Sequence, residues 1–490
     1  MELRSRRDPA AISASEEILG LGRQSMLPEQ ERRVMFHEHI LTAVIDAGGV
    51  PYQVGGSIRD ELLGLPVKDH DIEVFHLPAD VLARVLAPFG DVSEVGVSFG
   101  VIKLRTQAGH ELDFTLPRRE NKIGRGHRGF QVEVDHTMTL EESAARRDFS
   151  INSLYRDCRT HELFDPFQGR VDLEQRILRA TSEHFAEDPL RVLRGFQFAA
   201  RFGLTLEPAT AEMCRSLREE YSSLPVERVW GEWFKWATKA RHPGAGLEVL
   251  VRTGWIEFYP ELRALIDVPQ DPEWHPEGDA WVHTALVCDA AAEVAERHGL
   301  PDDERVVLMF AALCHDLGKA VTTVFEGRWK SLGHCEAGVP LSRQFLQRIG
   351  CPEWIIEQVE PLVAEHLVHV QHEITPRAVR RLSERLGKAS ITQLIRLVEA
   401  DMNGRPPLPK GLPASAVRLA ELSRELEVER SRPQPLLLGR HLIALGHAPD
   451  VWFREVLSEC YQAQLDGIFI DEGNAHEFLK ELMNRKADRR

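Results

Sequence analysis

One stretch near the N-terminus decides the fold: residues 54–75 read VGGSIRDELLGLPVKDHDIEVF. Gly55 and Gly56 join a short strand, expected over Pro51–Val54, to a helix expected over Ser57–Leu63. A strand that passes through glycines into a helix directs backbone N–H groups and the helix dipole at an anion. Glycine also lets a phosphate approach the backbone closely. The stretch therefore predicts a phosphate-binding turn in a small α/β or α+β domain.

Charged side chains in and after this turn suit triphosphate chemistry. Arg59 lies one helical turn in, where its guanidinium can reach the same phosphate. Asp69 and Asp71 alternate at a second strand, expected over Asp71–Phe75, so their carboxylates face one way. Asp113 lies on the second arm of a hairpin predicted over residues 100–106 and 110–116. We predict that Asp69, Asp71 and Asp113 are catalytic, and that Asp69 and Asp71 bind Mg²⁺ against a nucleoside triphosphate.

Length and composition exclude several classes of protein. The 490 residues suffice for roughly two to four domains. No apolar run reaches membrane-spanning length, and no secretory signal is expected. Seven cysteines without a CxxC pair indicate reduced thiols in a cytoplasm. A net charge of −16 argues against a protein that coats nucleic acid non-specifically. A nucleic-acid partner must therefore bind at a local basic patch. One candidate patch consists of Arg118, Arg119, Lys122, Arg125 and Arg128. The alternative is that these residues form a solvated basic loop.

Two further groups of residues lie in the second part of the chain, where apolar residues recur at helical spacing from about residue 170 onward. Glu187, Asp188 and a proline begin a helix, and Arg191 and Arg194 follow on one face of it. Beyond them come scattered histidines and aspartates whose imidazole and carboxylate groups suit a divalent metal. These residues are His283, His315, Asp316, His334, His366 and Asp401, with His369 and His372 as competing candidates.

The order of these motifs resembles the class II tRNA nucleotidyltransferase and poly(A) polymerase family, in the DNA polymerase β-like superfamily. The resemblance begins at residues 54–75 and continues through RRDFSIN at 146–152 and DPFQGRVDL at 165–173. It extends through EDPLRVLRGFQFAARFG at 187–203 and ERVWGE at 227–232. It implies an α+β protein, with a mixed-sheet catalytic head followed by all-helical neck, body and tail regions.

The resemblance also implies roles for individual residues. Asp188 and Arg191 would act as an amino-acid template, since C and A both offer an amine to a carboxylate and a ring nitrogen to an arginine. The nucleotide would further contact Gly55, Gly56, Arg59, Arg147, Asp148, Asn152, Glu187 and Arg194. Gln197 stands where a further arginine is expected, which puts one contact in doubt. The full-length loop from Arg118 to Arg146 implies that the terminal adenosine can be added.

The histidine and aspartate pattern resembles the HD phosphohydrolase superfamily, as in bacterial CCA-adding enzymes that carry this module. It implies that His283, His315, Asp316 and Asp401 bind Mg²⁺, Mn²⁺, Ni²⁺ or Co²⁺, with His334 and His366 as further candidates. The expected domains are an extension at 1–30, the head at 31–165, the neck and body at 166–270, the HD domain at 271–405 and the tail at 406–490.

The expected function is addition of CCA, or of its terminal A, to tRNA from CTP and ATP. A phosphoesterase activity of the HD domain is expected beside it. Three alternatives remain open: an enzyme that adds only the A, a poly(A) polymerase, and an HD phosphohydrolase with an inactive head. No membrane partner is expected, and a homodimer is left open.

Overall fold

The computed structural model describes residues 29–67, 71–93, 100–106, 109, 111–122, 130–370 and 373–487. Asp69, Arg125, Arg128, His372 and nearly all of the expected extension lie outside these residues. The chain forms two compact units, residues 1–188 and residues 189–490. Within the described residues, no helix is both long enough and apolar enough to cross a membrane.

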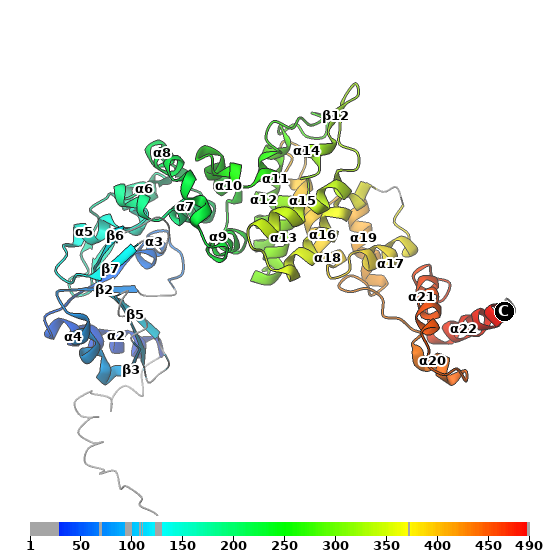
Figure 1. The fold of residues 1–490 in the computed structure, drawn as a ribbon, viewed down its shortest axis with the longest axis horizontal. Helices are drawn as coiled ribbons and strands as arrows, with labels where there is room; N and C mark the ends of the chain where they lie inside the picture. The colour runs from blue at the N-terminus through cyan, green and yellow to red at the C-terminus, as the bar shows by residue number, and fades with distance from the viewer. Residues whose placement is uncertain are drawn as a thin grey trace, which may run out of the picture. The chain divides into compact units, whose positions relative to one another are not determined.

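The first unit is built on a seven-stranded mixed sheet with the order β3-β4-β5-β2-β1-β8-β9 (Figure 1). Only the β2–β5 pair is parallel among the pairings in this sheet that the structure describes. The strands of the sheet are β1 (Val50–Val54), β2 (Asp71–Phe75), β3 (Gly90–Ser93), β4 (Val101–Thr106), β5 (Glu111–Thr115), β8 (Tyr155–Asp157) and β9 (Leu163–Phe164). A separate hairpin pairs β6 (Arg118–Lys122) with β7 (Phe130–Val134). The helices are α2 (Glu29–Asp46), α3 (Gly56–Leu62), α4 (Ala79–Leu86), α5 (Leu140–Ala145) and α6 (Gly169–Glu174).

The two faces of the sheet have different chemistry because strand residues alternate in direction. Ile72 and Val74 point into a core that also takes apolar residues of α2, α4, β4 and β5. The opposite face carries Asp71 and Glu73, with Phe75 packed near Tyr155 farther along. One face therefore holds the sheet to its helices, and the other is available for polar chemistry.

The second unit is helical. Its helices begin with α7 (Leu190–Phe202), α8 (Pro208–Ser216), α9 (Val226–Lys239), α10 (Pro243–Arg252) and α11 (Pro260–Arg263). They continue with α12 (Ala280–Arg297), α13 (Asp302–Cys314), α14 (Lys319–Thr322), α15 (His334–Arg348), α16 (Glu353–Glu365), α17 (Pro376–Arg385), α18 (Ile391–Asn403) and α19 (Ala414–Glu425). The tail helices α20 (Gly439–Ala444), α21 (Trp452–Leu465) and α22 (Glu472–Ala487) share a small core of their own. The α+β architecture expected from the sequence is confirmed.

A cluster of aromatic rings ties several helices of the second unit together. Trp233 and Trp236 of α9 are fully buried, and both pack against Phe196 of α7. Phe310 of α13 contacts both tryptophans, and Phe345 of α15 contacts Trp233. Large rings of this kind bury much apolar surface, so the cluster is a major source of stability for this unit.

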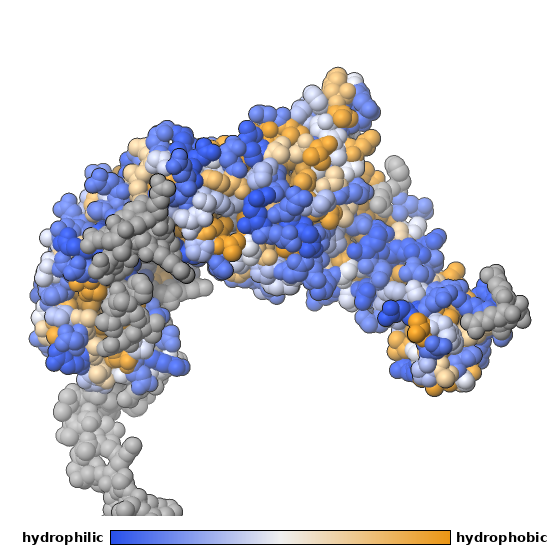
Figure 2. Space-filling model, viewed as in Figure 1, coloured by the Kyte–Doolittle hydropathy of each residue, from blue (hydrophilic) through white to orange (hydrophobic). Residues whose placement is uncertain are grey.

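A short hairpin, β12 (Val324–Phe325) with β13 (Trp329–Lys330), connects α14 to α15. Val324 and Phe325 are 51% and 62% exposed, and hydrophobic atoms lie at the tip of the molecule in Figure 2 where Figure 1 labels β12.

Candidate active sites in the head and the helical unit

The glycine turn forms where the sequence predicted a phosphate-binding turn. Gly55 follows β1 with a φ of 68°, a left-handed conformation that favours glycine, and Gly56 begins α3. The Gly55 N–H donates to the Leu154 carbonyl at 3.1 Å. Arg59 is buried and donates to Asn152 Oδ1 at 2.5 Å and to Asp60 Oδ1 at 2.7 Å. Two of the predicted nucleotide-binding residues, Arg59 and Asn152, thus hold each other.

Two of the carboxylates predicted to be catalytic, Asp71 and Asp113, lie on neighbouring strands. Asp71, the first residue of β2, is the register partner of Asp113 in the parallel strand β5. Register partners in a parallel pair point to the same face, so both carboxylates share the polar face of the sheet. Lys103 of β4 lies opposite Asp113, with its Nζ 3.3 Å from Asp113 Oδ2.

A buried glutamate that sequence reasoning missed organises the same face. Glu73, two residues after Asp71, accepts hydrogen bonds from Ser143 Oγ at 2.5 Å and Tyr155 Oη at 3.2 Å. The third donor to Glu73 is Arg147, whose guanidinium lies 2.8 Å from the Glu73 carboxylate. Although burial opposes the charge, Tyr155 and Glu73 raise the pKa of Arg147, so this arginine stays cationic. The position of Glu73 at i+2 from Asp71 was the one signal available.

The remaining predicted nucleotide contacts fall in both units. Asp148 is buried and accepts from the Phe149 N–H and from Asn152 Nδ2 at 2.8 and 2.9 Å. Glu187 accepts from Arg146 at 2.9 Å. Asp188 is the last residue of the first unit. Three others lie in α7 of the second unit: Arg191, Arg194, whose guanidinium is 5.2 Å from the Phe198 ring centre, and the buried Gln197.

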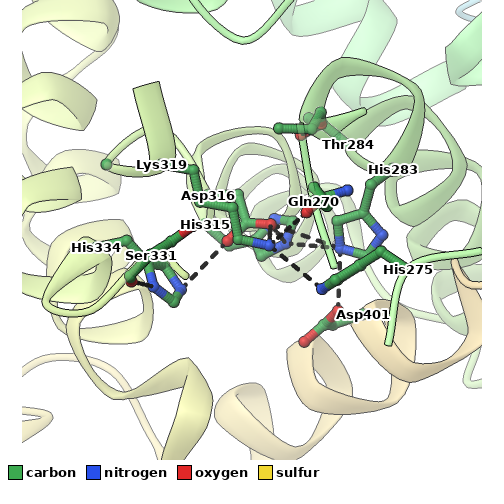
Figure 3. Close-up of polar contacts among 12 residues, drawn as sticks. Gln270, His275, His283, Thr284, His315, Asp316, Lys319, Ser331, His334 and Asp401 are labelled. Carbon is green, nitrogen blue, oxygen red and sulfur yellow. Dashed lines mark hydrogen bonds and ion pairs between the residues drawn. The ribbon is translucent and has the colours of Figure 1, made fainter. Parts of the chain in front are cut away.

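In the second unit, the structure brings together all six predicted metal-binding residues, and Figure 3 labels each of them except His366. They come from the first turn of α12, the end of α13, the starts of α15 and of the 3₁₀ turn at His366–Val370, and the end of α18. Gly318 makes the approach possible, since a Cβ there would lie 2.0 Å from the His334 carbonyl oxygen. His369 is not among the candidate metal-binding groups that the described residues form.

The carboxylate of Asp316 divides this cluster into two halves. In the first half, Asp316 Oδ2 lies 3.1 Å from His315 Nε2 and 3.6 Å from His283 Nε2. His283 Nε2 is also 3.2 Å from Asp401 Oδ1 and 3.3 Å from His315 Nε2. In the second half, Asp316 Oδ1 lies 3.3 Å from His334 Nε2 and 3.9 Å from His366 Nε2.

The histidine rings are oriented by their other nitrogens. The Nδ1 atoms of His315, His334 and His366 lie 2.8, 2.6 and 2.7 Å from backbone carbonyl oxygens, which places their proton on Nδ1. The Nε2 lone pairs therefore point into the cluster, where His334 and His366 Nε2 are 3.3 Å apart. Burial lowers the pKa of His366 to about 3 and also lowers that of His334, so both rings are neutral. Converging lone pairs on neutral rings are a donor set for a cation.

Three more residues at this cluster were not predicted. Lys319 Nζ lies 2.7 Å from Asp316 Oδ2 and also donates to Gln270 at 2.7 Å. Glu277 Oε1 is 2.7 Å from His283 Nδ1, and with Asp401 it raises the pKa of His283 against the effect of burial. Cys335 Sγ lies 3.8 Å from His334 Nε2. Cys335 directly follows a predicted ligand, which was a usable signal.

Two family models match the regions of the chain that contain these residues. Residues 51–179 match the Poly A polymerase head domain, and residues 281–401 match the HD domain. The Multifunctional CCA protein of Xanthomonas campestris pv. campestris (strain B100) is 40% identical over 367 residues, which cover 72% of this chain and 85% of that protein. The protein of the same name from Xylella fastidiosa (strain M23) is 40% identical over 367 residues, with coverage of 72% and 84%. The crystal structure of the Bacillus stearothermophilus CCA-adding enzyme in complex with CTP has the same fold, with a TM-score of 0.63, 23% identity and coverage of 92% and 97%.

Proposed function

Because the chain belongs to the family of multifunctional CCA proteins, we propose that it adds the CCA terminus to tRNA from CTP and ATP. The observation that carries this function is the placement of Asp71 opposite Asp113, on the polar face that also holds Glu73 and Arg147. The reaction is attack of the RNA 3′-hydroxyl on the α-phosphate of the nucleotide, with release of pyrophosphate.

The residues of the polar face divide this chemistry between them. Asp71 and Asp113, with Asp69, would hold Mg²⁺, which activates the hydroxyl and stabilises the leaving group. Arg147, held by Glu73, would contact the triphosphate. Asp188 and Arg191 would read the base, by accepting from its exocyclic amine and donating to its ring nitrogen.

The test supplies tRNAs that end at the discriminator base, at C or at CC, with CTP and ATP added separately. We expect C addition to the first two and A addition to the third. Asp71→Ala should abolish both, whereas Asp80→Ala, an exposed carboxylate on α4, should change neither. Addition confined to A on CC-ended tRNA would identify an A-adding enzyme instead. Addition of CC that stops with ATP abundant would contradict the role of the full-length 118–146 loop.

For the second unit we propose a metal-dependent phosphoesterase that acts on 2′,3′-cyclic phosphates at RNA ends. The oriented Nε2 atoms and the carboxylates of Asp316 and Asp401 suit Ni²⁺, Co²⁺, Mn²⁺ or Mg²⁺. A bound ion would lower the pKa of a water for attack on phosphorus. Lys319, beside Asp316, would neutralise a phosphate oxygen. Attack of water that breaks the P–O3′ bond would leave the phosphate on O2′ and free the 3′-hydroxyl that the head extends.

A double variant separates the two activities. His315→Ala with Asp316→Ala should abolish hydrolysis of a 2′,3′-cyclic nucleotide and leave nucleotide addition intact. His298→Ala, an exposed histidine at the end of α12, is the matched control and should retain both activities. If the wild type hydrolyses no cyclic phosphate with any of the four metals, the proposal is wrong.

A further inference from the structure

We infer that Cys335 is a thiolate ligand in the second half of the HD cluster, where it completes a metal site with His334, His366 and Asp316. The inference rests on the proposal that this cluster binds divalent metal, and it assigns a ligand that the HD motif does not include. It predicts two metal subsites of different chemical character in one cluster.

The distances among these donor atoms are close to those of a tetrahedral site, and the longest are those from His366 Nε2 to Asp316 Oδ1 and to Cys335 Sγ, at 3.9 and 4.0 Å. Two atoms each about 2.0–2.1 Å from one ion lie about 3.3–3.4 Å apart, and a sulfur at about 2.3 Å lies about 3.5–3.6 Å from such a nitrogen. His334 Nε2 is 3.3 Å from His366 Nε2 and 3.3 Å from Asp316 Oδ1. Cys335 Sγ lies 3.8 and 4.0 Å from the same two nitrogens. Shifts of a few tenths of an ångström would let all four atoms contact one ion.

The orientation of the rings supports the same conclusion. His334 and His366 are buried, and their Nδ1 atoms are fixed by the carbonyls of Ser331 and Val363. Two lone pairs and a sulfur thus face one point. All seven cysteines lie in the described part of the chain, and Cys335 is the one that forms a candidate metal-binding group.

The sulfur distinguishes the two halves of the cluster. Imidazoles and carboxylates alone form the first half, at His283, His315, Asp401 and Asp316 Oδ2. A thiolate in the second half favours Zn²⁺, Co²⁺ or Ni²⁺ over Mg²⁺ or Mn²⁺, because soft ligands select such ions. Binding is a substitution, in which the metal–sulfur bond forms as the S–H bond breaks and the proton passes to solvent.

Cobalt substitution tests the inference without an activity assay. The full chain is stripped of metal, titrated with Co²⁺ under reducing conditions, and followed by near-ultraviolet absorption and by metal content. We expect a thiolate-to-cobalt charge-transfer band in the wild type. Cys335→Ser should lose the band and bind one cobalt ion fewer per chain. Cys335→Asp, which supplies an oxygen ligand, should keep that ion and lose the band, so loss of the band does not depend on loss of the site.

Cys158→Ser is the matched control, because Cys158 is another partly exposed free cysteine, and it should keep the band. Circular dichroism checks that each variant folds. The inference is overturned if the wild type binds cobalt without the band, or if the band survives in Cys335→Ser. A cobalt protein with the band but without phosphoesterase activity would refute only the proposed activity. Hydrolysis without the band would refute only the thiolate ligand.

Discussion

The buried Glu73–Arg147 pair offers the most quantitative test of the head. We expect Glu73→Ala to lower the free energy of unfolding of the first unit by about 3 kcal/mol. Loss of one partner of a buried ion pair costs about 3–5 kcal/mol. Arg147 is 26% exposed, so water reduces that cost to about 2 kcal/mol. The buried hydroxyls of Ser143 and Tyr155 lose their acceptor, which adds about 1 kcal/mol.

Native-state hydrogen exchange measures this change directly. Amides of β1 and β2 that exchange only through unfolding of the unit should exchange about 10²-fold faster in Glu73→Ala, since about 1.4 kcal/mol corresponds to a factor of ten. The control is Asp80→Ala, which removes a pair with Arg84 whose side chains are 74% and 73% exposed. Exposed pairs contribute little, so exchange should change by about twofold at most.

Two results would refute this reasoning. Exchange in Glu73→Ala no faster than in Asp80→Ala would show that the pair does not stabilise the unit. Glu73→Gln keeps an acceptor and the side-chain volume, so its effect should fall between those of the other two variants. The KM for CTP should rise in both Glu73 variants because Arg147 loses its anchor. An unchanged KM alongside faster exchange would show that Arg147 does not contact the triphosphate.

Three further predictions concern base choice, acidity and metal. Asp188→Ala should weaken discrimination against UTP and GTP as well as slow addition. Single-turnover incorporation of all four nucleotides measures both effects, and a variant as selective as its parent would contradict the prediction. Hydrogen bonds from Thr137 and Arg119 lower the pKa of Asp135 to about 2, so their stabilisation is complete above the ordinary carboxyl pKa of 3.8 and is lost as the pH falls through 2. Between pH 4 and pH 2, the protection factors of amides in the β6–β7 hairpin, which compare exchange with its intrinsic rate at the same pH, should therefore fall in the wild type and change less in Asp135→Asn. Chelation should remove about 2.7 kcal/mol of stability from the second unit, relative to metal at a hundred times its Kd, and so lower its melting temperature. A calorimetric trace unchanged by chelator and by re-added Co²⁺ would contradict this.

Local sequence pattern predicted individual strands and helices well, but it did not predict which of them lie side by side. The strand Asp71–Phe75 was predicted to the residue, because alternation and flanking turn residues define it. That β5 lies beside β2 depends on strand order, which periodicity does not encode, so the sequence indicated Asp113 as a third carboxylate but did not predict its pairing with Asp71. Glu73 looked like an ordinary strand residue because its partner Arg147 is 74 positions away.

The HD cluster shows the same limit. His315 and Asp316 were identifiable because they are adjacent and end a helix. Glu277 and Lys319 contact His283 and Asp316, which are only six and three positions away, but His283 and Asp316 meet only when α12 and the end of α13 pack together. Sequence analysis treated Cys335 as one of seven dispersed thiols, and only the fold places it beside two imidazoles.

The aromatic cluster of the second unit also gives the two units different absorption and fluorescence. All nine tryptophans lie beyond residue 229, including the buried Trp233 and Trp236, whereas the first unit contains tyrosine but no tryptophan. Light absorbed at the red edge of the aromatic band therefore excites only the helical unit. Its emission will follow denaturation of that unit alone, while far-ultraviolet circular dichroism follows both. One unlabelled sample can thus resolve the two transitions.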